Sequence, residues 1–69
     1  MQMAQGLPMT PLTLAARVCL GLEPGLHLFI EPCHSGRVTL LISGKGAPAA
    51  LVARRSEWAE ALREAAKGL

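Results

Sequence analysis

The stretch 26–43, "LHLFIEPCHSGRVTLLIS", decides the fold, because two runs of alternating apolar residues flank a short polar loop. Alternation with a period of two is typical of strands that bury one face. The segment "PCHSG" between the runs contains the proline, serine and glycine that favour a reversal of the chain. The sequence therefore predicts an antiparallel β-hairpin, whose apolar face carries Leu26, Leu28, Ile30, Val38, Leu40 and Ile42.

The residues before the hairpin, "LTLAARVCLGLEPG", predict a short helix and then a tight turn. Thr13 can cap this helix and Gly21 can end it. Pro24 and Gly25 fit a type II turn, since proline sets φ at the second position and glycine accepts a positive φ at the third. We expect a short helix joined to the hairpin by this turn.

The chain is small and apolar: it has 69 residues, of which 51% are hydrophobic and 17% are charged. A hairpin with one or two turns of helix buries too little apolar surface to be stable alone in water. Chains of this size gain stability from disulfides, a metal or a second copy. We favour the second copy and expect a homodimer.

The net charge is +2, and four of the seven Lys and Arg residues lie between Arg54 and Lys67. Arg17 is the one Lys or Arg before Pro32, whereas a protein that binds phosphates on its own shows a basic stripe. A dimer would double Arg17, Arg37 and Lys45, which would partly make up for the missing basic stripe.

The sequence indicates a cytoplasmic protein with reduced thiols, since it shows neither a signal-peptide pattern nor an apolar run of about 18 residues.

The residues that could bind zinc lack paired ligand spacing, so no metal is predicted. A small domain held together by zinc is kept as the least favoured alternative. These residues are Cys19, His27, Cys33 and His34. The chain has no Asp, no paired carboxylates and no phosphate-binding glycine loop, so we expect neither an enzyme nor a cofactor.

The pattern divides the chain into an N-terminal arm (1–11), a hairpin domain (12–43), a linker (44–53) and a C-terminal amphipathic helix (54–69). Ser56 is the predicted N-cap of the last helix, and Glu60–Arg63 and Glu64–Lys67 are predicted ion pairs. The apolar stripe of this helix contains Trp58, Ala61, Leu62 and Ala65. The stripe either folds back to complete the chain's own core or docks in a groove of another protein.

The segment "RVCLGLEPGLHLFIE…SGRVTLLI" resembles the swapped-hairpin domain of AbrB- and MazE-type proteins, which carry an Arg-x-x-Leu-Gly-Leu core, a glycine turn and two strands. The tail "RRSEWAEALREA" is similar to the toxin-binding arm of MazE- and VapB-like antitoxins. The family's first proline falls on Thr13 here, its turn Asp on Leu26, and its basic arm on "MQMAQGLPMT", which has no Lys or Arg.

The resemblance implies a mostly β fold with a short helix, in which a homodimer interleaves its hairpins into one β-barrel and carries a C-terminal helical tail. It also implies an antitoxin-like DNA-binding transcriptional regulator. Arg17 and Arg37 would contact operator DNA, and the stripe of Trp58, Ala61, Leu62 and Ala65 would neutralise a ribonuclease-type toxin. The alternative is a small structural or interaction module that dimerises without binding DNA.

Overall fold

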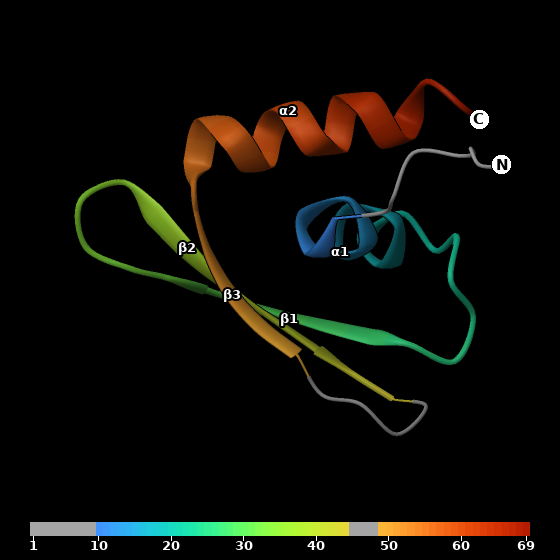
Figure 1. The fold of residues 1–69 in the computed structure, drawn as a ribbon, viewed down its shortest axis with the longest axis horizontal. Helices are drawn as coiled ribbons and strands as arrows, with labels where there is room; N and C mark the ends of the chain where they lie inside the picture. The colour runs from blue at the N-terminus through green and yellow to red at the C-terminus, as the bar shows by residue number, and fades with distance from the viewer. Residues whose placement is uncertain (1–9, 45–48) are drawn as a thin grey trace, which may run out of the picture.

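The computed structural model describes residues 10–44 and 49–69, which form a helix, three strands and a second helix. The elements are α1 (Pro11–Cys19), β1 (His27–Pro32), β2 (Arg37–Ser43), β3 (Ala49–Arg54) and α2 (Arg55–Ala66). The three strands make one antiparallel sheet in the order β1-β2-β3, and both helices lie over the same face of it (Figure 1). The described residues are therefore of a mixed α/β class. Most of the predicted N-terminal arm lies outside the described residues.

The predicted hairpin is confirmed, and its register places the expected apolar residues on one face. Leu28 is paired with Ile42 and Ile30 with Leu40. This inner face is covered by the helices, and on β2 it buries Val38, Leu40 and Ile42. Because side chains alternate across a strand, the residues between them lie on the opposite, outer face.

Helix α1 begins earlier than the sequence predicted. Thr10 is its N-cap, and the Thr10 hydroxyl accepts a hydrogen bond from the backbone N–H of Thr13 at 3.1 Å. Pro11 occupies the first turn, where the missing N–H has no helical partner to lose. At the other end, the N–H of Leu22 donates to the Arg17 carbonyl at 2.9 Å and that of Gly21 to the Val18 carbonyl at 3.0 Å, which is a Schellman motif.

The second half of the predicted linker is a strand. Residues Ala49–Arg54 form β3, which pairs with β2 over its whole length. The segment is rich in alanine, which has little preference for strands, so its own sequence does not predict one. Pairing with β2 supplies the hydrogen bonds, and Ala53 is buried beneath the helices. Residues 45–48 of the predicted linker lie outside the described residues.

Helix α2 follows β3 without a loop, and Arg54 rather than Ser56 is its N-cap. The Glu57 carboxylate accepts a hydrogen bond from the Arg54 N–H at 3.0 Å, which satisfies one of the free donors at the helix start. The predicted ion pairs are confirmed, at 2.8 Å for Glu60–Arg63 and 2.9 Å for Glu64–Lys67. The hydrogen bond that the Lys67 ammonium donates to the Glu64 carboxylate raises the pKa of Lys67.

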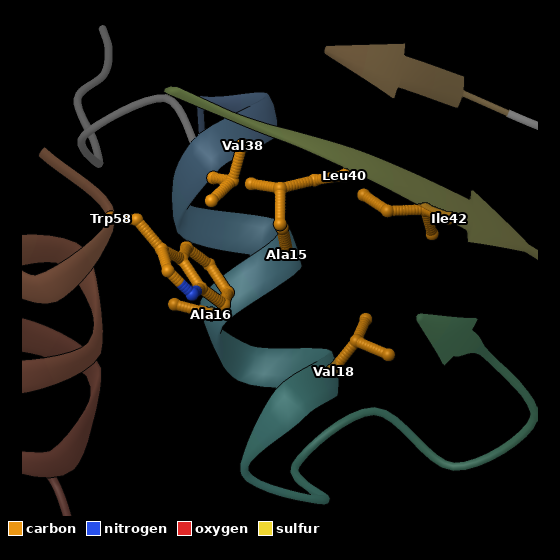
Figure 2. Packing of buried hydrophobic residues seen from close by; sticks show 7 residues of the cluster. All are labelled: Ala15, Ala16, Val18, Val38, Leu40, Ile42 and Trp58. Atoms are coloured by element: carbon orange, nitrogen blue, oxygen red, sulfur yellow. The ribbon is translucent and has the colours of Figure 1, made fainter. Parts of the chain in front are cut away.

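The core lies between the two helices and the inner face of the sheet. Figure 2 shows Val38, Leu40 and Ile42 pointing from β2 toward α1, with the Trp58 ring of α2 beside α1. Ala15 and Ala16 are fully buried, and their small side chains let α1 approach both the sheet and α2. Leu40 is the one large side chain among the described residues that is completely inaccessible to solvent.

The turn between α1 and β1 passes close to the end of β2. A β-carbon at Gly44 would collide with the Gly25 carbonyl, and Gly44 has a φ of +113°, which side-chain-bearing residues rarely adopt. We expect Gly44→Ala to lower the free energy of unfolding by about 1–3 kcal/mol. Urea denaturation measures this, and Gly68→Ala is the control, because a β-carbon at Gly68 meets nothing closer than 3.8 Å. Equal stability of the two variants would contradict the close approach.

Candidate nucleic-acid interface

Three arginines gather at one end of the sheet. Arg37 begins β2 and is paired in register with Arg54, the last residue of β3, while Arg55 begins α2. Directly opposite residues on an antiparallel pair have β-carbons about 4.5–5.5 Å apart and share a face, which here is the outer face. The N–H of Arg55 donates to the Gly36 carbonyl at 2.9 Å, so the start of α2 is tied to the hairpin loop. We refer to Arg37, Arg54 and Arg55 as the arginine cluster.

The hairpin loop fixes the position of Arg37 in this cluster. Ser35 and Gly36 both have left-handed backbone conformations, with φ of 63° and 69°. The N–H of Cys33 donates to the Arg37 carbonyl at 2.8 Å, which closes the loop at the base of the strands. The backbone of Arg37 is therefore fixed by the loop hydrogen bond and by its pairing with β3, while its side chain is exposed.

No ion pair within the described residues involves the side chains of the arginine cluster, although the Glu57 carboxylate lies at the same helix start, 3.0 Å from the Arg54 N–H. The ion pairs found there join Arg17 with Glu23, Arg63 with Glu60 and Lys67 with Glu64, and none involves the cluster. Like charges directly opposite each other destabilise a pair of strands. Two of these arginines also lie at the start of α2, where the helix dipole is positive and disfavours a cation. A bound anion would reverse both unfavourable interactions.

The outer face of the sheet is apolar beside the cluster. Phe29, Leu41 and Ala50 lie side by side across the three strands, and Thr39 lies beside Val52. Neither of the two helices in the described part of the chain covers this face (Figure 1), and the exposed fractions of Phe29 and Val52 are 62% and 60%. We refer to these five residues as the open face.

The two predicted DNA contacts lie in different surroundings. Arg37 belongs to the arginine cluster, on the face of the sheet that the helices leave uncovered. Arg17 lies in the last turn of α1, and its Nε donates to the Glu23 carboxylate at 2.7 Å. The charge of Arg17 is thus balanced within the chain, so the structure does not bring Arg17 and Arg37 into one basic surface.

The predicted partner-binding stripe packs in the chain's own core. Trp58 is 9% exposed and belongs to the main cluster of buried residues (Figure 2). Ala61, Leu62 and Ala65 are partly buried and pack against the same cluster. The sequence left open whether the stripe completes the chain's own core or docks on another protein. In this structure it completes the chain's own core.

The cysteines and histidines do not assemble into a ligand set. The described residues contain no group of three or more His, Cys, Asp or Glu side chains that could hold a metal. Cys19 is exposed, and the Cys33 sulfur lies 2.8 Å from the Thr39 hydroxyl oxygen. Within residues 10–44 and 49–69, no helix is both long and apolar enough to cross a membrane.

A shallow groove of about 450 Å³ lies between the starts of the two helices. Its lining includes Leu12 and Ala61 and the side chains of Glu57 and Glu60. Both carboxylates already accept hydrogen bonds, from the Arg54 N–H and from the Arg63 guanidinium. Ser56 also lines the groove, which is open to solvent.

Comparison of the chain with family models, with curated proteins and with solved structures finds no match. Sequence reasoning missed Arg54 and Arg55 as site residues because it placed them in a helical tail. Residues 49–53 are all apolar and show no alternation, so the sequence carried no clear signal for a strand there.

Proposed function

We propose that the protein is a small nucleic-acid-binding regulator that works as a homodimer. The observation that carries this proposal is the arginine cluster, in which Arg37, Arg54 and Arg55 lie together without a carboxylate partner among the described residues. A guanidinium group binds phosphate oxygens through two parallel hydrogen bonds, which makes arginine the preferred residue for phosphate recognition.

Phosphate binding also accounts for the unfavourable charges of the free chain. Each arginine that contacts a phosphate releases counterions from the nucleic acid, which supplies most of the affinity at low salt. A single cluster makes few contacts of this kind, and a second copy doubles them. The small core, with one large side chain fully buried, also supports association with a second copy.

The resemblance to AbrB- and MazE-type proteins gives the finer form of this proposal. In that form two chains exchange their β1–β2 hairpins to build a common barrel, and α2 neutralises a ribonuclease-type toxin. Toxin binding through Trp58 and Leu62 would require α2 to separate from α1, because both side chains pack in the chain's own core. DNA binding by the arginine cluster requires no such rearrangement.

The second candidate is an interaction module that self-associates and binds no nucleic acid. The exposure of Phe29 and Val52 on the open face favours this candidate, since contiguous apolar patches mark interaction surfaces. In that case the arginine cluster would bind nothing.

We expect the double substitution Arg37→Gln, Arg54→Gln to weaken binding to fluorescein-labelled DNA, tested both as a single strand and as a duplex, by about tenfold per arginine at 0.1 M salt. Fluorescence anisotropy measures the dissociation constant, and thermal melting confirms that the variant is folded. Arg63→Gln is the matched control, because Arg63 is exposed and paired with Glu60 on α2. Unchanged affinity of the double variant, or an equal loss in Arg63→Gln, would contradict the proposal.

A further inference from the structure

The outer face of the sheet carries an exposed aromatic ring together with Arg37 and Arg54 of the arginine cluster. Phe29 projects from the uncovered side of β1, next to Leu41 of β2. Arg37 lies on the same face of β2, four residues from Leu41, which is a separation of about 13 Å at about 3.3 Å per residue. A few nucleotides of an extended strand can span the distance from the arginines to the ring.

We infer that single-stranded nucleic acid is the ligand of this surface, with its phosphates on the arginine cluster and its bases on Phe29 and the open face. The inference rests on the proposed function and names the class of nucleic acid. Exposed aromatic side chains stack on the faces of unpaired bases, and neighbouring basic residues follow the backbone. His27 lies on the same face, two residues from Phe29, and offers a second flat side chain for stacking.

The chemistry of the surface disfavours a duplex. In a duplex the base faces are stacked on one another, and the outside presents charged phosphates and groove edges. A duplex placed on the arginines would hold its phosphates against Phe29, Leu41 and Val52, which would remove water from charges without compensation. A single strand instead presents apolar base faces to the apolar residues.

The charges of the outer face define the course of the strand. Glu31 lies on the outer face of the edge strand β1, opposite Thr39, and repels phosphates there. Arg37 and Arg54 lie on the β2–β3 side of the same sheet. The phosphates therefore enter over β2 and β3, and the bases reach across toward Phe29.

The test compares one 12-nucleotide sequence as a labelled single strand and as a duplex, by anisotropy at matched salt with the full chain. We expect the single strand to bind at least tenfold more tightly than the duplex. Phe29→Ala should weaken single-strand binding by roughly 5- to 150-fold, the range for loss of one stacked base, and should not weaken duplex binding. Phe29→Trp should retain binding, and Leu69→Ala, which removes an exposed side chain elsewhere, should have no effect.

Each other outcome overturns the inference in a recognisable way. If the duplex binds as tightly as the single strand and Phe29→Ala changes neither, the arginine cluster binds nucleic acid but the open face does not. If neither form binds, the proposed function fails as well. If light scattering shows that Phe29→Ala converts a dimer to a monomer while single-strand affinity is unchanged, a second copy covers the open face.

Discussion

Trp58→Ala is expected to lower the free energy of unfolding by about 3–5 kcal/mol, the range for removal of a buried aromatic side chain. Trp58 is 9% exposed and lies between α2 and α1, beside the fully buried Ala16 (Figure 2). A chain of this length has a total stability of about 3–10 kcal/mol, so the variant should be largely unfolded or close to it. Thermal unfolding followed by circular dichroism measures the change.

Trp58→Phe is the matched variant, because it keeps an apolar ring in the same position and should lose much less stability. The result also separates the two interpretations of the C-terminal helix. If Trp58→Ala melts at the same temperature as the natural chain, the indole does not hold α2 on α1. The stripe would then be available to a partner, as the antitoxin resemblance implies.

Leu40→Ala is expected to cost about 2–5 kcal/mol of stability, because Leu40 is completely buried at the centre of the sheet. Its side chain contributes to the core under α1, and no neighbouring element can close the cavity without moving the helix or the strand (Figure 2). Urea denaturation with a linear extrapolation gives the free energy directly.

The adjacent Leu41 supplies a control of the same residue type on the same strand. Leu41 lies on the open face and is only partly buried, so Leu41→Ala should cost clearly less than Leu40→Ala. A loss as large in Leu41→Ala as in Leu40→Ala would mean that the outer face is as tightly packed as the inner one. That result would contradict an open face.

The parts of the fold that depend on local pattern could be predicted from the sequence. The alternation in 26–43 predicted the hairpin, and the apolar faces it defined are those that pair in the structure, as with Leu28 and Ile42. The C-terminal helix followed from its apolar stripe and its ion pairs. The start of helix α1 differs from the prediction. The sequence predicts Thr13 as the N-cap, whereas the Thr10 hydroxyl accepts the capping hydrogen bond.

The parts that depend on tertiary pairing could not be predicted. The segment 49–54 is short and rich in alanine, and it becomes a strand because β2 offers it an edge. The arginine cluster arises from the same pairing, since only the register of β3 places Arg54 opposite Arg37. The sequence also left open whether the C-terminal helix packs on its own chain. In the structure Trp58 of α2 belongs to the buried cluster.

Phosphate binding by the arginine cluster is best tested by the salt dependence of single-strand binding, because this dependence counts the phosphates that the cluster neutralises. For each chain that the strand contacts with its three arginines, the logarithm of the association constant should fall with the logarithm of salt concentration at a slope of about −2. Arg54→Gln should reduce the size of this slope by about 0.7. A slope near zero, or a slope that Arg54→Gln leaves unchanged, would contradict phosphate binding by the arginine cluster.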